Sequence, residues 1–224
     1  MEEGKEGFDR RLIVLAVFAL VAVGVVGAIL ISRSGGGGGS STATACTEEE
    51  APAGAKSYSC PDLEETLPDG STAQVKTNFG VFTIDLATEE APLTTTSFAY
   101  LVEEGFYDGL TFHRVVPEFV IQGGDPLGNG SGGPGYSVVE KPPASLKYTK
   151  GVVAMAKTGT DPPGTSGSQF FVVLAAEAGL PPEYALVGKV SKGMGTVETI
   201  GKLPTEGETP KQKVLIESMT IEKG

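Results

Sequence analysis

A run of twenty apolar residues near the amino terminus, Leu12 to Ile31, constrains this chain more than any other feature. A helix rises about 1.5 Å per residue, so the run spans roughly 30 Å of hydrocarbon. A buried core helix is rarely apolar on every face, and the apolar part of a signal peptide is usually about 7–15 residues long. The run therefore predicts one transmembrane helix over residues 12–31.

The basic residues beside this helix predict its orientation. Lys5, Arg10 and Arg11 precede the helix, whereas Arg33 alone follows it closely. Because Lys and Arg favour the cytoplasmic side, residues 1–11 are expected to form a cytoplasmic tail. The expected location is therefore the cell membrane, as a single-pass protein whose folded part is extracytoplasmic.

Residues 32–72 have the composition of a flexible linker. They contain five consecutive glycines, many small residues and an acidic triplet, and such a segment cannot bury enough apolar surface to order itself. Both cysteines of the chain, Cys46 and Cys60, lie here. On the oxidising side of a membrane they are candidates for a disulfide that closes a short loop, with two free thiols as the alternative.

The charge balance and the single histidine exclude several function classes. The chain has 17 basic and 28 acidic residues, for a formal net charge of −11, and no basic run compensates locally. A phosphate backbone would be repelled, so nucleic-acid binding is not expected. One histidine also argues against a His-rich metal site or a Ser-His-Asp triad, and no metal or other cofactor is expected.

From residue 73 to residue 224 the pattern is that of short strands separated by turns. Apolar and polar residues alternate over 73–86, which predicts a hairpin. Helices are expected over 91–105, where Pro92 stands near the start, and over 193–202. Further strands are expected over 110–116, 119–123, 151–157, 168–174, 184–190 and 213–222. Together they predict a mainly β fold, an antiparallel barrel with helices over its ends.

Three short motifs are set aside. Residues 128–133 spell G-x-G-x-x-G, but Pro134 follows where a helix should open. The segment around Ser166 lacks the second glycine of a nucleophile elbow, so a serine hydrolase is not expected. Asp125 has no second carboxylate cluster at a useful spacing, which favours a turn residue over a metal ligand.

Four segments remain, in a fixed order: FHRVVPEFVIQGGD at 112–125, GVVAMA at 151–156, GSQFF at 167–171 and ALVGKV at 185–190. Together they closely resemble the cyclophilin family of peptidyl-prolyl cis/trans isomerases, over roughly Ala73 to Glu222. The resemblance implies a closed eight-stranded antiparallel barrel capped by two helices. It makes residues 73–224 a cyclophilin-like domain.

The resemblance also implies a site, in which Arg114 takes the position of the catalytic residue. The implied substrate-binding positions are His113, Phe119, Val120, Gln122, Ala156, Lys157, Gln169, Phe171, Leu180 and Tyr184. The chemistry agrees, because rotation of an X-Pro bond needs an apolar slot and a fixed donor for the prolyl nitrogen as amide resonance is lost. Arginine, always charged and rigidly forked, suits that task. No proton is transferred, so His113 is expected to be a structural, hydrogen-bonding neighbour.

Four positions depart from common family residues. Val120 stands where Met is frequent, Lys157 where Asn is common, Gly179 where many eukaryotic members carry Trp, and Tyr184 where they carry His. The departures at Gly179 and Tyr184 imply an altered pocket rim and fit a bacterial-type member, whereas Lys157 implies a change in substrate preference near the proline.

The expected function is prolyl isomerisation during the folding of exported proteins. The expected partners are proline-containing polypeptides, with a monomeric catalytic domain anchored through residues 12–31. A noncatalytic proline-peptide binding or chaperone module on the same fold remains an alternative, because a fold does not guarantee turnover. A third alternative is an adhesin or wall-assembly scaffold in which the tether to the membrane matters most.

Overall fold

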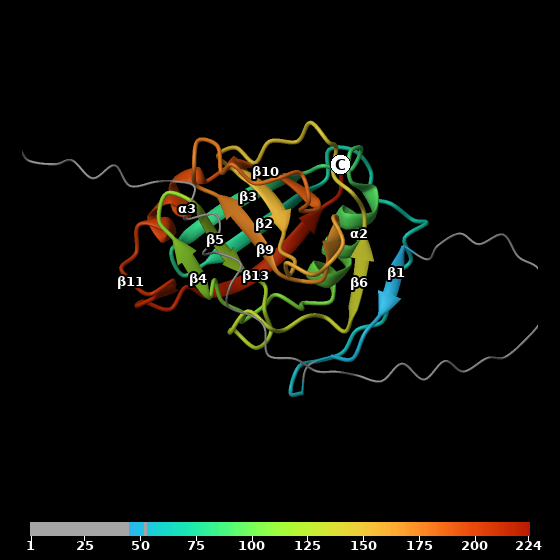
Figure 1. Ribbon diagram of the computed structural model, residues 1–224, viewed down its shortest axis with the longest axis horizontal. Helices are drawn as coiled ribbons and strands as arrows, with labels where there is room; N and C mark the ends of the chain where they lie inside the picture. The colour runs from blue at the N-terminus through green and yellow to red at the C-terminus, as the bar shows by residue number, and fades with distance from the viewer. Residues whose placement is uncertain (1–44, 52) are drawn as a thin grey trace, which may run out of the picture. The chain divides into compact units, whose positions relative to one another are not determined.

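The computed structural model describes residues 45–51 and 53–224. Its centre is one antiparallel sheet in the strand order β13-β2-β3-β10-β7-β9-β5-β4 (Figure 1). The strands are β2 (Thr72–Thr77), β3 (Gly80–Leu86), β4 (Arg114–Val116), β5 (Val120–Gly123), β7 (Val152–Met155), β9 (Phe170–Val173), β10 (Leu186–Lys192) and β13 (Ile216–Glu222). Each overlaps a stretch expected to form a strand, so the prediction of these eight strands is confirmed.

Two helices flank this sheet, as predicted. Helix α2 (Pro92–Glu103) contacts β13, β10 and β6, whereas α3 (Met194–Gly201) contacts β3, β5 and β4. Figure 1 shows them on opposite sides of the sheet. Helix α2 starts at a proline, whose fixed φ suits the first turn. Its free N–H groups at Leu93 and Thr94 donate to the carboxylate of Glu140, at 3.2 and 2.7 Å.

Strands β7 and β9 are buried on both faces, which explains why their sequences are continuously apolar. One face belongs to the main core inside the curled sheet, where Met155, Phe170 and Val172 are almost fully buried. The other face belongs to a second apolar group, here called the outer cluster. Its buried members are Val120, Tyr148, Val152, Ala154, Phe171, Val173, Ala178 and Tyr184, and its partly buried members are Phe119, Leu146, Ala156, Ala175, Leu180 and Leu186.

The expectation of a closed barrel is wrong, because the two edge strands β4 and β13 do not pair within the described residues. The free edge of β4 is instead occupied by a hairpin of β11 (Thr205–Glu206) and β12 (Thr209–Pro210): the Val115 N–H donates to the Glu208 carbonyl at 2.7 Å. Between the edges, only irregular backbone contacts remain, such as the bridge of Thr111 with Leu215. The sheet is therefore a curled half-barrel whose gap is bridged by loops.

The segment from residue 45 to residue 71 packs on the domain, which differs from the expected linker. Strand β1 (Cys46–Glu48) pairs with β6 (Tyr136–Val139), which also pairs with β8 (Thr165–Ser166). A disulfide joins Cys46 to Cys60, and Tyr58 meets Phe106 edge-on, with ring centroids 5.4 Å apart. Composition alone missed this order because the segment depends on partners supplied by the domain.

The predicted cytoplasmic tail, the predicted membrane helix over 12–31 and residues 32–44 of the predicted linker lie outside the described residues. Among residues 45–51 and 53–224, no helix is both long enough and apolar enough to span a bilayer.

Reduction of the disulfide should destabilise the domain. The two cysteines lie 14 positions apart. Closing a loop of this size lowers the conformational entropy of the unfolded chain, which stabilises the folded state by about 3 kcal/mol. The midpoint of urea unfolding of the full chain should therefore fall when dithiothreitol is added. The double variant Cys46→Ser, Cys60→Ser should have the same urea midpoint as the reduced protein, and this midpoint should not change when dithiothreitol is added. An unchanged midpoint on reduction would show that the bridge contributes nothing to stability.

Candidate active site

Strand register places the predicted site residues in one row across four strands. Arg114 on β4 lies opposite Gln122 on β5, and Gln122 lies opposite Phe171 on β9. Phe171 in turn lies opposite Ala154 on β7. Directly opposed residues of antiparallel strands project to the same face, so the row runs from a cation through an amide to an aromatic ring. This face carries the outer cluster.

A tight turn between β4 and β5 places Phe119 at the margin of the outer cluster. The Phe119 N–H donates to the Val116 carbonyl at 3.0 Å, which closes the turn. Pro117 presets the first central position, and Glu118 has a φ of 60°, a conformation usually left to glycine. The Phe119 carbonyl accepts the Leu174 N–H at 2.8 Å, which ties the turn to the end of β9.

A chain of side-chain hydrogen bonds runs away from Arg114. Its Nη1 donates to Oε1 of Gln122 at 3.1 Å, and Nε2 of Gln122 donates to Oε1 of Gln169 at 3.0 Å. Nε2 of Gln169 then donates to the carbonyls of Gly130 and Gly132, at 3.0 and 2.9 Å. Every donor points in the same sense along the chain. Both glutamine amides are therefore held in one orientation, with the guanidinium at the head.

Asp125 orders the loop that ends this chain. Its buried carboxylate accepts the N–H groups of Leu127 and Asn129, both at 2.8 Å, and also that of Gly130. The prediction of a turn residue is confirmed. Gly124 before it has a φ of 81°, and a Cβ there would lie 2.5 Å from the Ser168 carbonyl oxygen, so glycine is required.

The predicted pocket walls come together in the outer cluster, which contains Phe119, Val120, Ala156, Phe171, Leu180 and Tyr184. The ring of Tyr184 meets Phe171 edge-on, with centroids 5.5 Å apart. Burial raises the pKa of Tyr184 to about 12, so its phenol is uncharged at neutral pH. Next to Leu180, the space around a Cβ at Gly179 is open, which leaves this part of the rim without a side chain.

The ammonium of Lys157 is engaged with its own loop. Its side chain is only 3% exposed, and Nζ donates to the carbonyls of Thr158 and Asp161, at 3.2 and 3.1 Å. Nζ also lies 3.7 Å from the Glu183 carboxylate and 5.6 Å from the centroid of the Tyr184 ring. These contacts support the loop beside the pocket wall, and a direct contact of Lys157 with substrate stays a prediction.

His113 does not make the hydrogen bonds expected of it. Among the described residues, neither ring nitrogen has a hydrogen-bond partner, although both are buried. Burial lowers the pKa of His113, and the charge of Arg114 lowers this pKa further, whereas Asp125 and the backbone of Thr111 partly oppose the shift. The imidazole is therefore neutral at physiological pH.

This lowered pKa predicts a pH dependence of stability. The unfolded chain binds a proton to His113 near pH 6.5, and the folded chain binds it only at lower pH. Stability is therefore fully present above about pH 6.5 and is lost as the pH falls towards the folded pKa. Between pH 8 and about pH 5.5, the melting temperature of the wild type should fall more than that of His113→Gln. An equal fall in melting temperature for the two proteins over this pH range would contradict a buried neutral imidazole.

Sequence reasoning missed two residues that the structure adds to the site. Glu208 binds Arg114 through both carboxylate oxygens, across 94 positions of sequence. Tyr148 donates from its hydroxyl to the Tyr184 carbonyl at 2.7 Å and accepts the Tyr184 N–H at 2.9 Å. A glycine between two glutamates marks the turn that carries Glu208, but nothing local relates that turn to β4.

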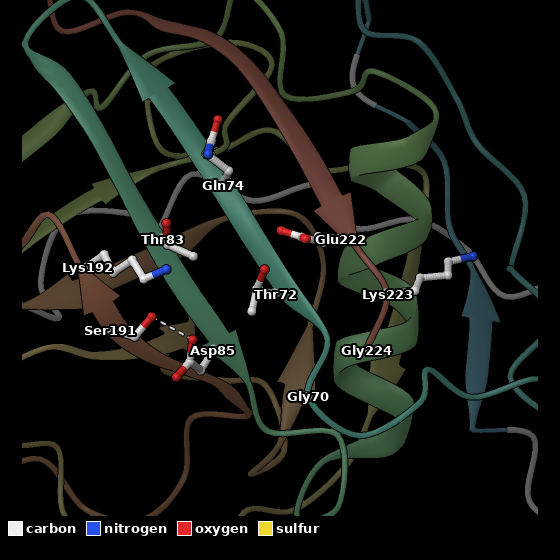
Figure 2. Close-up of a pocket in the computed structure, with 10 residues that line it drawn as sticks. All are labelled: Gly70, Thr72, Gln74, Thr83, Asp85, Ser191, Lys192, Glu222, Lys223 and Gly224. Carbon is white, nitrogen blue, oxygen red and sulfur yellow. Dashed lines mark hydrogen bonds between the residues drawn. The ribbon is translucent and has the colours of Figure 1, made fainter.

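A separate hollow of about 350 Å³ lies on the β13-β2-β3-β10 part of the sheet (Figure 2). It is lined by Gly70, Thr72, Gln74, Thr83, Asp85, Ser191, Lys192, Glu222, Lys223 and Gly224. Figure 2 shows Ser191 donating to the Asp85 carboxylate within it. This lining has no aromatic wall, so it does not suit a proline ring. Within the described part of the chain, no group of three or more His, Cys, Asp or Glu side chains could hold a metal ion.

The curled sheet is not the closed barrel that the sequence resemblance implied for a prolyl isomerase, but its two flanking helices and the fixed arginine in one row with the outer cluster agree with that resemblance. Residues 72–221 match the family described as cyclophilin type peptidyl-prolyl cis-trans isomerase/CLD, and the chain belongs to this family.

Its relatives come from several kingdoms. Peptidyl-prolyl cis-trans isomerase-like 1 of Neurospora crassa is 43% identical over 138 residues, covering 60% of this chain and 83% of the relative. Peptidyl-prolyl cis-trans isomerase B of Streptomyces anulatus is 40% identical over 170 residues, covering 67% and 95%. A crystal structure of a Cryptosporidium parvum cyclophilin type isomerase, determined in the presence of the dipeptide Ala-Pro, matches with a TM-score of 0.64 at 30% identity, covering 68% of this chain and 99% of that one. The predicted family and enzyme class are confirmed.

Proposed function

We propose that this chain accelerates rotation about X-Pro bonds, with Arg114 as the group that stabilises the twisted amide. The observation that carries the proposal is the Arg114 guanidinium, held at the head of the glutamine chain and in one row with Phe171 of the pocket wall. The apolar wall holds the proline ring, while the guanidinium faces the amide that must rotate. Neither a nucleophile nor a metal is needed for this reaction.

The donor count of Arg114 fits this role. A guanidinium carries five N–H groups, and the contacts of Arg114 within the described residues use one on Nη1 for Gln122 and two, on Nε and Nη2, for Glu208. One N–H on each terminal nitrogen remains for a substrate. As the amide twists, the lone pair returns to the prolyl nitrogen, and a fixed positive donor lowers the barrier of about 18–20 kcal/mol.

Proline-containing polypeptides are the proposed substrates. The similar Cryptosporidium parvum structure was determined in the presence of Ala-Pro, which supports a site that accepts a proline with a residue before it. His113, Val120 and Lys157 are proposed to shape the pocket through their neighbours, since the structure gives Lys157 contacts to its own loop.

Removal of the guanidinium should nearly abolish turnover. Loss of one preorganised donor costs about 10²–10³ in rate, so Arg114→Ala should lower kcat/KM for a short X-Pro peptide by that factor. Arg114→Lys should recover little, because a point charge on a flexible stem lacks the fork. His113→Gln should cost far less, because the reaction transfers no proton. Peptide binding without faster isomerisation by the wild type would favour the noncatalytic module, and a near-normal Arg114→Ala would refute the assignment.

The setting proposed for this activity is the folding of exported proteins by a bacterial-type, membrane-anchored member. The apolar run over 12–31 and the basic residues before it support the anchor. The disulfide between Cys46 and Cys60 supports an oxidising compartment. The Streptomyces anulatus relative and the residues at Gly179 and Tyr184 support a bacterial type.

Proteolysis of intact cells tests this topology. Because the domain is expected outside and residues 32–44 between it and the membrane, added protease should release a soluble fragment that contains the isomerase domain. The cytoplasmic tail should be degraded only after the membrane is permeabilised. Complete protection of the domain in intact cells, with cleavage after permeabilisation, would reverse the proposed orientation.

A further inference from the structure

We infer that Glu208 is a positioning residue for isomerisation, which sets the orientation of the Arg114 guanidinium. The inference rests on the proposed role of Arg114 in catalysis. Its starting point is a contact between two residues that lie 94 positions apart in the chain.

The contact between Glu208 and Arg114 is bidentate. Nε of Arg114 donates to Oε2 of Glu208 at 2.6 Å, and Nη2 donates to Oε1 at 3.3 Å. Such a fork fixes the plane of the guanidinium as well as its position. The Arg114 side chain is 17% exposed and that of Glu208 is 50% exposed, so solvent reaches the carboxylate more freely than the cation.

The backbone of Glu208 is anchored at the same place. In the β11–β12 hairpin, Glu206 lies opposite Thr209, so Gly207 and Glu208 form a two-residue turn. Gly207 has a φ of 60°, which the first position of such a turn requires. The Glu208 carbonyl accepts the Val115 N–H at 2.7 Å, next to Arg114 in β4. One residue therefore docks on β4 through both its backbone and its side chain.

The Glu208 carboxylate has two opposite effects on catalysis: it positions the guanidinium, and it reduces the positive charge near the substrate. Without Glu208, Gln122 alone among residues 45–51 and 53–224 would bind the guanidinium, and a long, mobile side chain would have to be ordered in each catalytic cycle. The carboxylate also offsets part of the positive charge that the twisted amide needs. Because this carboxylate is half exposed, water screens its charge, whereas its two hydrogen bonds still fix the fork. Positioning therefore outweighs the loss of charge.

The test is Glu208→Gln in the full chain, with Glu206→Gln as the matched control. Glu206 belongs to the same hairpin and has the same charge, yet it makes no side-chain hydrogen bond or ion pair in the described part of the chain. Glu208→Gln should lower kcat about fivefold to tenfold, while KM for the X-Pro peptide stays within about twofold, because the apolar wall binds the proline. Glu206→Gln should leave both constants unchanged.

A spectroscopic readout separates positioning from a general structural effect. In the wild type, the Nε–H of Arg114 donates to a carboxylate, so its NMR signal should be protected from exchange with water. The signal should weaken or vanish in Glu208→Gln and persist in Glu206→Gln. Glu208→Asp keeps the charge but shortens the side chain. It should lower kcat almost as much as Glu208→Gln does, a decrease that a pure charge effect would not produce.

The outcomes distinguish the inference from the proposed function. If Arg114→Ala is nearly as active as the wild type, the catalytic role of Arg114 fails, and this inference fails with it. If Arg114→Ala is inactive while Glu208→Gln turns over normally or faster, only the positioning role is overturned. In an Arg114→Lys background, Glu208→Gln should change the rate by less than about twofold, because no fork remains to be positioned. If Glu208→Gln lowered kcat in the Arg114→Lys variant by the same factor as in the wild type, the inference would also be overturned.

Discussion

The antiparallel pairing of β5 with β4 on one side and β9 on the other is the constraint on which the site depends. It sets Gln122 opposite both Arg114 and Phe171, so a cation, an amide and an aromatic ring share one face at neighbouring positions. A one-residue slip in either pair would turn one partner to the opposite face of the sheet. The Pro117–Glu118 turn and the Asp125 loop hold this register at the two ends of β5. The geometry of the proposed site thus follows from backbone hydrogen bonding between the strands.

Much of this architecture could be predicted from sequence, because alternation and turn residues act locally. The eight strands and both helices follow from such patterns, whereas the row of pocket residues was implied by the family resemblance. Closure could not be predicted, since it depends on whether β4 pairs with β13 or with a hairpin whose Glu208 lies 94 positions after Arg114 in the chain. The same applies to the packing of residues 45–71 and to Glu208, whose partners are distant in the chain. Local sequence patterns predict helices and strands, whereas the segment that pairs with a sheet edge depends on contacts between residues distant in the chain.

The site also shows how the chain limits charge around its apolar wall. His113 is kept neutral by burial, and burial holds the phenols of Tyr148 and Tyr184 in their uncharged form, with pKa values raised to about 12. The ammonium of Lys157 is paired with the Glu183 carboxylate and donates to backbone carbonyls. In the proposed site, the charged group bound to Gln122 of the glutamine row is the Arg114 guanidinium, which is paired with Glu208.

The amino-terminal segment has a mechanical consequence. Tension applied at residue 45 reaches Cys46 and crosses the disulfide directly to Cys60, so the covalent load path bypasses the intervening loop. That loop includes Glu49 and Tyr58, whose N–H groups bind the carbonyls of Gly135 and Pro134 beside the Gln169 support. These two contacts lie inside the loop that the disulfide closes, whereas the Ala45 carbonyl accepts the Val139 N–H outside it. The disulfide therefore offers mechanical load a covalent route from Cys46 to Cys60 that leaves out the backbone between the two cysteines.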